Sequence, residues 1–452
     1  MKGKNILVVG IGKSGIAASE LLKKAGAEVT VYDNKTFSKD GEGAEKLEWA
    51  EKNGFKTFFG IAPNDVKKYD MLVVSPGVPL ETPFIAEAAD YGIDIIGELE
   101  LAYRMGHGKF IAITGTNGKT TTTMLTGEIF KNAGRKTEVV GNVGVAVASI
   151  AAEADEDTWL VTECSSFQLD TTKTFRPVVS ALLNITPDHL DRHKTMENYE
   201  NAKGKVFANQ QKTDYFVVNA DDAPSMKQAQ KCKARVVPFS RVKKLDFGAC
   251  LDDGTIIIVN GSGERHSICK ETELKIPGKH NLENALAAAA VSYFAGIPVD
   301  IIASTLRTFE GVEHRIEYCG TKNSVRFVND SKGTNPDASI KAIEAIDGGI
   351  VLIAGGYDKG SQFDEFIKSF GGRVKAMVIM GKTGPKVKAA ADAAGFTNTE
   401  MAENMRVAVN KAFSLAAPGN TVLLSPACAS WDMYRCFEDR GDDFKKCFEE
   451  LE

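Results

Sequence analysis

The sequence lacks any long apolar run. No stretch of its 452 residues approaches the roughly 18 consecutive apolar residues that a membrane-spanning helix needs. The first residues, MKGKNILVVG, lead directly into a strand pattern and lack the apolar stretch and cleavage site of a signal peptide. The eight cysteines include no CxxC pair, which argues against a disulfide framework or a zinc site and favours a reducing compartment. We therefore expect a cytoplasmic protein without a membrane partner.

An excess of positive charge is also absent. The 55 basic and 60 acidic residues give a net charge of −5. A mildly acidic chain has no global field that gathers nucleic acid, so we expect no nucleic-acid partner, and any phosphate site must be local. The hydrophobic share of 43% and the charged share of 25% are ordinary for globular proteins and argue against disorder or a fibre.

Short apolar runs alternate with helical patterns along the whole chain. This βαβ alternation predicts an α/β protein built on doubly wound parallel sheets. The length suggests about three domains, and we place them at residues 1–98, 99–304 and 305–452. Strands are predicted at residues 5–10, 28–33, 71–75, 109–114, 158–163, 181–185, 216–219, 255–259, 326–329, 350–354, 376–380 and 421–425, and helices at 14–25 and 281–294.

A first glycine-rich turn follows the first predicted strand. Residues 10–15 read GIGKSG, and Asp33 ends the next strand about 20 residues later. This is the dinucleotide-binding pattern, in which glycines let the backbone approach a diphosphate at a helix N-terminus. The pattern indicates a diphosphate and a ribose-like polyol, so NAD and a uridine diphosphate sugar fit equally well. A tight turn that binds no ligand is the third alternative.

A second glycine-rich turn, TGTNGKT at residues 114–120, joins a strand to a helix and indicates an ATP phosphate loop. Its backbone N–H groups would cradle phosphates, Lys119 would reach the β and γ oxygens, and Thr120 would bind Mg²⁺. The general pattern has glycine where this chain has Ile113, so the loop is a shortened variant. A threonine-rich helix start is the alternative, but a lysine has no capping role there.

Together the two turns suggest an enzyme that uses ATP on a large substrate carrying a diphosphate. Glu163 ends the apolar run TWLVTE, and a carboxylate at that end of a strand is well placed for Mg²⁺. His189 and Lys203 are not distinguished by their own chemistry. Such a histidine is more often a surface residue, and such a lysine is usually a solvated helix residue.

Several longer segments then occur in a fixed order: TGTNGKTTT, TECSSFQL, NITPDHLDRH, PGKHNLENALAA, EHRIE, NDSKGTNPDA, IAGGYDKG and LLSPACASWD. With them the chain resembles the Mur ligases of peptidoglycan synthesis over essentially its whole length. The segments NDSKGTNPDA and LLSPACASWD point to the branch of that family that adds D-glutamate. The resemblance implies an N-terminal Rossmann-like parallel sheet, a central P-loop ATPase-like α/β domain and a C-terminal Rossmann-like α/β domain.

The resemblance also implies roles for individual residues. The catalytic residues would be Lys119, His189, Lys203 and Lys332. Two Mg²⁺ ions would be held by Thr120, Glu163, His189 and Lys203, the last as a carbamylated lysine. ATP would contact Gly115, Thr116, Asn117, Gly118, Lys119, Thr120, Thr121, Asn281, Asn284, Arg315 and Asp330. The uridine diphosphate substrate would contact Lys13, Ser14, Gly15, Asp33, Ser75, Pro76, Gly77 and Asn142, and D-glutamate would contact Thr334, Lys359, Ser430, Trp431 and Phe437.

The reaction that the resemblance implies joins two small molecules, UDP-N-acetylmuramoyl-L-alanine and D-glutamate. The substrate carboxylate would attack the γ-phosphate of ATP, and the amine of D-glutamate would attack the resulting acyl phosphate. We expect a monomer whose domains close during the reaction. Three alternatives remain open at this point: another ligase of the superfamily, such as a different Mur step or folylpolyglutamate synthase; an NAD-dependent oxidoreductase; and a non-catalytic regulator that senses nucleotides.

Overall fold

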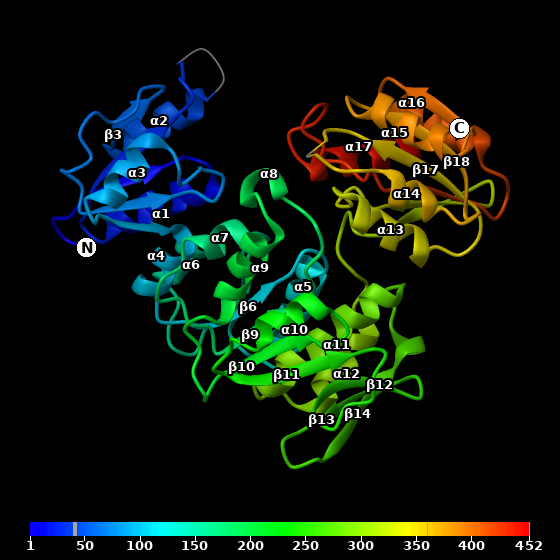
Figure 1. Cartoon of the computed structure of the whole chain (residues 1–452), viewed down its shortest axis with the longest axis horizontal. Helices are drawn as coiled ribbons and strands as arrows, with labels where there is room; N and C mark the ends of the chain where they lie inside the picture. Colours follow the sequence, from blue (N-terminus) through cyan, green and yellow to red (C-terminus); the bar gives the residue numbers. More distant parts are fainter. Residues whose placement is uncertain (39–42, 359, 452) are drawn as a thin grey trace.

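The computed structural model describes residues 1–38, 43–358 and 360–451. These residues form three β-sheets, one in each successive part of the chain, and each sheet is covered by helices. The N-terminal and C-terminal domains lie on either side above the central domain (Figure 1), and the short helix α8 (Leu190–His193) lies between them. None of the helices in the described residues is long and apolar enough to cross a membrane.

The N-terminal domain has a five-stranded parallel sheet in the order β3-β2-β1-β4-β5. The direction of winding reverses between β1 and β4, and in such sheets ligands bind beyond the strand ends at that point. The GIGKSG turn and Ser75 both lie there. The strands are β1 (Asn5–Val9), β2 (Glu28–Asp33), β3 (Lys56–Phe59), β4 (Met71–Val74) and β5 (Asp94–Gly97), and the helices are α1 (Lys13–Lys24), α2 (Ala44–Asn53) and α3 (Pro83–Asp90).

The central domain has a nine-stranded mixed sheet in the order β14-β13-β12-β11-β10-β9-β6-β8-β7. Strands β12, β13 and β14 run antiparallel to one another, and the rest of the sheet is parallel. The strands are β6 (Lys109–Thr114), β7 (Thr137–Gly141), β8 (Trp159–Glu163), β9 (Val179–Leu182), β10 (Tyr215–Asn219), β11 (Arg235–Ser240), β12 (Gly248–Asp252), β13 (Thr255–Val259) and β14 (Arg265–Lys270). The helices are α4 (Glu98–Met105), α5 (Lys119–Asn132), α6 (Val147–Ala151), α7 (Ser166–Asp170), α8, α9 (Met196–Gly204), α10 (Ala223–Ala229), α11 (Lys279–Phe294) and α12 (Val299–Thr308).

Helix α11 explains why the alanine-rich segment of the sequence shows little amphipathic pattern. It packs against both α5 and the sheet, and the side chains of residues 285–291 are fully buried. A helix that is apolar on all sides belongs in a core. The predicted domain boundary near residue 305 falls within α12, whose buried residues belong to the same apolar cluster as α11.

The C-terminal domain has a six-stranded sheet in the order β15-β16-β20-β17-β18-β19, parallel except for the edge strand β15. The strands are β15 (Glu317–Lys322), β16 (Val325–Asn329), β17 (Ile350–Gly355), β18 (Val374–Met380), β19 (Thr399–Ala402) and β20 (Thr421–Leu424), and the helices are α13 (Pro336–Ala345), α14 (Asp364–Lys368), α15 (Gly384–Ala393), α16 (Met405–Leu415) and α17 (Phe437–Glu449). The predicted three-domain α/β class is therefore confirmed. Edge strands such as β3 and β19 escaped prediction because half-exposed strands lack a continuous apolar run.

Candidate active site

A cavity of about 390 Å³ is lined by residues of all three domains. It brings together many residues that the sequence predicted to be functional but that lie far apart along the chain. From the N-terminal and central domains these are Lys13, Thr116, Asn117, Gly118, Lys119, Thr120, Asn142, Glu163 and His189. From the C-terminal domain they are Arg315, Lys332, Thr334, Ser430, Trp431 and Phe437.

The phosphate loop leaves the end of β6 and leads into α5. Gly118 has a φ of 83°, and a Cβ there would lie 2.3 Å from the side-chain oxygen of Asn284. Glycine is therefore required both for the left-handed backbone and for the close approach of Asn284. Lys119 Nζ donates hydrogen bonds to the carbonyls of Gly115 at 3.0 Å and Thr116 at 2.8 Å. The lysine thus lies over the loop, on the side that faces the cavity.

Glu163 is buried at the end of β8 and has an oxygen available for a ligand. Its Oε1 accepts a hydrogen bond from Asn142 Nδ2 at 2.7 Å, whereas Oε2 has no hydrogen-bond partner among the described residues. Burial opposes ionisation, but the positive charges of Lys332 and Lys119, together with hydrogen bonds from Asn142 and Thr120, lower the pKa of Glu163. An ionised buried oxygen next to the Thr120 hydroxyl on the phosphate loop fits the oxygen-rich coordination that Mg²⁺ prefers.

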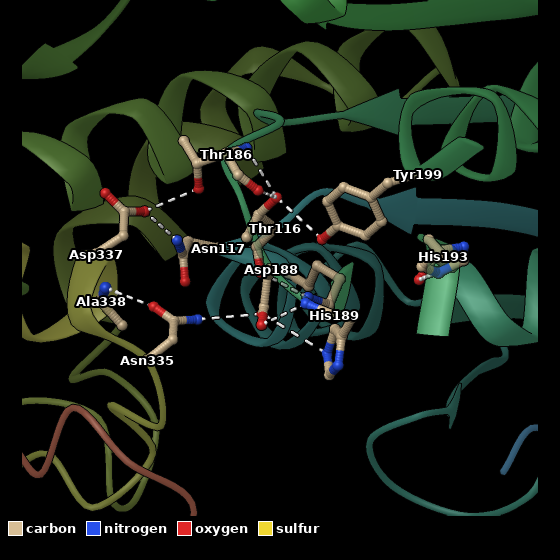
Figure 2. Close-up of polar contacts among 12 residues, drawn as sticks. Thr116, Asn117, Thr186, Asp188, His189, His193, Tyr199, Asn335, Asp337 and Ala338 are labelled. Carbon is tan, nitrogen blue, oxygen red and sulfur yellow. Dashed lines mark hydrogen bonds and ion pairs between the residues drawn. The ribbon is translucent and has the colours of Figure 1, made fainter. Parts of the chain in front are cut away.

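His189 lies on a strained segment between β9 and α8. Its φ of 53° is in the left-handed region, where a non-glycine residue is uncommon. Asp188 holds it in place: Asp188 Oδ1 accepts the His189 backbone N–H at 2.9 Å, and Asp188 Oδ2 lies 3.6 Å from His189 Nε2. The Phe167 ring packs 4.9 Å from the imidazole. Figure 2 shows this pair beside the phosphate-loop residues Thr116 and Asn117.

Lys203 is a buried lysine beneath the phosphate loop, not a solvated helix residue. It lies on α9 with only 1% of its surface exposed, and its Nζ donates a hydrogen bond to the Gly115 carbonyl at 2.6 Å. The Nζ also lies 4.5 Å from the centre of the Tyr199 ring. Burial and then the charge of Lys119 lower the pKa of Lys203 well below its usual range, while Asp188 and Glu163 act in the opposite direction. Burial therefore favours the neutral form of the amine.

A second, smaller cavity shares Asn117, Gly118 and Arg315 with the first. The predicted ATP residues Asn117, Gly118, Thr121, Asn284, Arg315 and Asp330 line it. Asn281 lies behind Asn284 and accepts a hydrogen bond from its side chain at 3.0 Å. Asp330 is fully buried, which raises its pKa to about 6 against the opposing charge of Arg315. The residues predicted to hold the nucleoside part of ATP therefore lie together, and they come from the central and C-terminal domains.

The GIGKSG turn folds as the glycine pattern requires. A Cβ on Gly15 would lie 1.8 Å from the carbonyl oxygen of Gly10, so no larger residue fits. Ser75 Oγ donates a hydrogen bond to that carbonyl at 2.7 Å, and Asp33 Oδ2 accepts the Ile11 N–H at 3.0 Å. The structure thus brings Asp33 and Ser75 to the glycine-rich turn at residues 10–15. Of the residues predicted for the uridine substrate, Lys13 and Asn142 line the shared cavity, whereas Ser14, Gly15, Asp33, Ser75, Pro76 and Gly77 do not.

The C-terminal wall of the cavity carries Lys332 and the residues predicted to bind D-glutamate. Lys332 is half-buried, and its Nζ lies 4.7 Å from the centre of the Phe437 ring. Burial lowers the pKa of Lys332 to about 8, although the negative charge of Glu163 opposes the shift. Lys359, the remaining residue predicted to bind D-glutamate, lies outside the described residues.

Arg440 is a residue that the sequence did not single out. It lies in α17 and is the largest fully buried side chain among the residues that the structure describes. Its guanidinium donates hydrogen bonds to Ser331 Oγ at 3.0 Å and to the carbonyls of Ser331 at 2.7 Å, Cys428 at 3.1 Å and Ala429 at 3.2 Å. Arg440 thereby joins the segment before Lys332 to the segment before Ser430. No local signal indicated this, because its surroundings, FEDRGDD, read as a charged surface helix.

Three family descriptions match successive parts of the chain. "Mur ligase MurD-like, N-terminal domain" matches residues 4–97, "Mur ligase middle domain" matches residues 113–292, and "Mur ligase, glutamate ligase domain" matches residues 314–428.

Curated relatives match over almost the full length of both chains. The UDP-N-acetylmuramoylalanine--D-glutamate ligase of Thermoanaerobacter sp. (strain X514) is 50% identical over 455 residues, which cover 100% of this chain and 99% of the relative. The protein of the same name from Clostridioides difficile (strain 630) is 47% identical over 446 residues, 98% of each chain.

Solved structures share the fold at lower identity. The UDP-N-acetylmuramate-alanine ligase of Thermotoga maritima aligns with a TM-score of 0.61 and 19% identity over 99% of each chain. A pseudomurein peptide ligase type C from Methanothermus fervidus aligns with a TM-score of 0.60 and 18% identity over 100% of each chain.

Proposed function

The chain belongs to the Mur ligase family, and we propose that it adds D-glutamate to UDP-N-acetylmuramoyl-L-alanine in peptidoglycan synthesis, converting ATP to ADP and phosphate. Relatives about 50% identical over the full length are named as ligases of this kind. The observation that carries the proposal is the shared cavity. It places the phosphate-loop Lys119, the buried Glu163 and the C-terminal Lys332 around one space.

The cavity suits a reaction in two steps. In the first, an oxygen of the substrate carboxylate attacks the γ-phosphorus of ATP and the bond to ADP breaks, giving an acyl phosphate. In the second, the amine of D-glutamate attacks the acyl carbon, phosphate leaves and the amine loses a proton. Lys119 and Lys332 would neutralise the charge that builds up on the transferring phosphoryl group. No protein nucleophile takes part, so Cys164 beside Glu163 serves only as a buried packing residue.

Mur ligases use ATP and Mg²⁺, and the residues present fit the metal. We propose two ions, one held by Thr120 and Glu163 and the other by His189 and Lys203. Bound Mg²⁺ supplies charge neutralisation and Lewis acidity at the phosphates. A cationic Lys203 would repel a metal, whereas a carbamate formed on its amine is an anionic oxygen ligand. The burial of Lys203 and its position against the Gly115 carbonyl support this modification.

The remaining assignments follow the same division of the chain. The turn at residues 10–15 and the Ser75 segment would hold the uridine diphosphate, and Thr334, Ser430, Trp431 and Phe437 would surround D-glutamate. The two cavities support binding of ATP between the central and C-terminal domains. We propose that the protein acts as a cytoplasmic monomer with domains near residues 1–98, 99–304 and 305–452.

Phosphate release with different amino acids tests the function. Purified protein is incubated with ATP, Mg²⁺ and UDP-N-acetylmuramoyl-L-alanine, together with D-glutamate, L-glutamate, D-alanine or meso-diaminopimelate. We expect continuous phosphate release with D-glutamate, at least about 100-fold faster than with the other three, because a site built to pair a polar group rejects partners that leave it unpaired. Release with another acceptor alone, or with folate and glutamate instead, would assign the chain to a different ligase.

A further inference from the structure

The first turn of α13 reaches from the C-terminal domain across to the phosphate loop. Asn335 caps this helix, with its side-chain oxygen accepting the Ala338 N–H at 2.8 Å, and Asp337 follows in the first turn. Both side chains also form hydrogen bonds to residues of the central domain, as Figure 2 shows. None of the roles that the family resemblance implies involves Asp337.

Asp337 contacts the two segments that form the nucleotide side of the site. Its Oδ2 accepts hydrogen bonds from Asn117 Nδ2 of the phosphate loop and, at 3.1 Å, from Thr186 Oγ1. Lys341, one turn later on α13, lies 3.1 Å from the same oxygen and balances its charge. A carboxylate near a helix N-terminus is also favoured by the helix dipole. Lys341 and the N-terminus of α13, both in the C-terminal domain, therefore stabilise the negative charge of Asp337 independently of its contacts with the phosphate loop.

Asn335 makes a parallel contact with the segment that carries His189. Its Nδ2 donates a hydrogen bond to Asp188 Oδ2 at 3.3 Å, and Asp188 in turn positions His189. One turn of helix thus touches the phosphate loop and the segment of the predicted metal ligand at once.

The two central segments are themselves bound together where α13 meets them. Thr116 Oγ1 donates to the Thr186 carbonyl at 3.1 Å and accepts the Thr186 N–H at 3.0 Å. The backbone N–H of Asn117 donates to Asn184 Oδ1 at 2.9 Å, and Asn184 Nδ2 donates to the Asn117 carbonyl at 3.1 Å. A contact at this junction acts on both segments, so docking of the C-terminal domain and the shape of the phosphate loop are coupled.

We infer that Asp337, assisted by Asn335, is a positioning residue that docks the C-terminal domain on the phosphate loop and holds the loop in its ATP-binding shape. Docking also brings Arg315 and Lys332 to the cavity, since both belong to the same domain. By linkage, ATP that favours the docked arrangement must bind more weakly when the docking contact is removed. The inference rests on the proposed function only in taking ATP as the ligand of the loop.

The test compares Asp337→Ala with Glu344→Ala, which removes an exposed carboxylate from the same helix. We expect Asp337→Ala to raise the KM for ATP about fivefold or more and to leave the KM for the uridine substrate within about twofold, because that substrate binds on the other side of the cavity. Small-angle scattering without ligands should show a larger radius of gyration for Asp337→Ala. Glu344→Ala should match the wild type in all three measurements.

Two further variants separate positioning from a general loss of structure. Asp337→Asn keeps a hydrogen-bonding side chain of the same shape and should recover part of the ATP affinity. Thr186→Val should raise the KM for ATP in the wild-type background and have little further effect in Asp337→Ala, because the shared contact is already lost. Multiplicative effects in the double variant, or an unchanged ATP affinity and radius in Asp337→Ala, would overturn the inference.

A wrong function is distinguished from a wrong docking role by nucleotide binding. Titration of a fluorescent ATP analogue and scattering need no turnover, so both still report on Asp337 if D-glutamate proves not to be the acceptor. If the wild type fails the phosphate-release assay but Asp337→Ala binds nucleotide more weakly than the wild type, the proposed function is wrong and the docking role is supported.

Discussion

The central and C-terminal walls of the cavity are built in different ways. On the central wall, the phosphate loop and Glu163 follow directly from the ends of the neighbouring parallel strands β6 and β8, so the sheet itself sets their spacing. On the C-terminal wall, Lys332 and Ser430 lie on two separate loops that the buried guanidinium of Arg440 ties together. One wall therefore takes its geometry from a sheet, and the other depends on a few side-chain hydrogen bonds.

This difference predicts how damage spreads. A change on the central wall should remove one chemical function and leave its neighbours in place, because the strands hold them independently. Replacement of Arg440, which holds the two loops of the C-terminal wall together, should shift several binding residues at once although it contacts none of their ligands.

Lys119→Ala should reduce kcat about 10³-fold, since Lys119 acts on charge that develops as the phosphoryl group transfers. Affinity for the uridine substrate should stay within a few-fold, because that site lies on another domain. Steady-state kinetics and calorimetric titration of the uridine substrate measure the two quantities. Lys131→Ala, an exposed lysine on the same helix, is the control. Wild-type turnover in Lys119→Ala would contradict the assignment of the loop.

Lys203→Ala should lose activity about 10²-fold if its carbamate serves as a metal ligand, and rescue by a small carboxylate distinguishes this from the loss of an unmodified buried lysine that only supports the Gly115 carbonyl. Formate or acetate at roughly millimolar concentration, as expected for weak binding, should restore part of the activity by occupying the vacated ligand position. The exposed Lys212 gives the matched control, Lys212→Ala.

A direct measurement of the modification accompanies the kinetics. The wild type equilibrated with carbon-13 bicarbonate should give a carbamate resonance that is absent from Lys203→Arg. Full activity of Lys203→Ala at low bicarbonate, together with no such resonance in the wild type, would exclude the carbamate.

Arg440→Lys should raise the KM for D-glutamate about tenfold, because a single ammonium cannot reach both loops and about 1.5 kcal/mol of hydrogen bonding is lost. The KM values for ATP and the uridine substrate should change less than twofold. Arg406→Lys is the control, since Arg406 pairs with Glu450 on the surface of the same domain. Equal increases in all three KM values would show that Arg440 has a general structural role and no specific effect on the loops predicted to bind D-glutamate.

The same contrast explains what could be predicted from the sequence. The strand at residues 109–114 and the loop that follows it were predicted with the correct bounds, because a buried apolar run and a glycine-rich turn are local signals. Glu163 was also predictable, since the end of a parallel strand is a defined place. Lys203 became visible only through family resemblance, and its burial only through the structure. Arg440 reaches Ser331, 109 residues away in the chain, and Asp337 reaches Asn117, 220 residues away; no local pattern encodes such contacts.

Glu98→Gln should leave turnover unchanged and alter only the pH dependence of stability. Glu98 begins α4 beneath the central wall, where its Oε1 accepts the Ala148 N–H at 2.5 Å while Oε2 has no hydrogen-bond partner among the described residues. Burial raises the pKa of Glu98 from 4.5 to about 7, although the Ala148 N–H opposes the shift. The folded chain therefore favours the protonated acid, whereas the unfolded chain releases the proton above about pH 4.5.

The sign of the effect follows from this difference. The favourable contribution of protonated Glu98 is complete below pH 4.5 and is lost as the pH rises through about 7, which amounts to about 3 kcal/mol at alkaline pH. Glutamine cannot ionise, so Glu98→Gln should unfold at a higher temperature than the wild type at pH 8 and at a similar temperature at pH 5. Thermal unfolding at four pH values between 5 and 8 measures this, with the exposed Glu156→Gln as the control. Parallel curves of unfolding temperature against pH for the wild type and Glu98→Gln would mean that the pKa of Glu98 is the same in the folded and unfolded chain. Protonation of Glu98 would then make no contribution to stability.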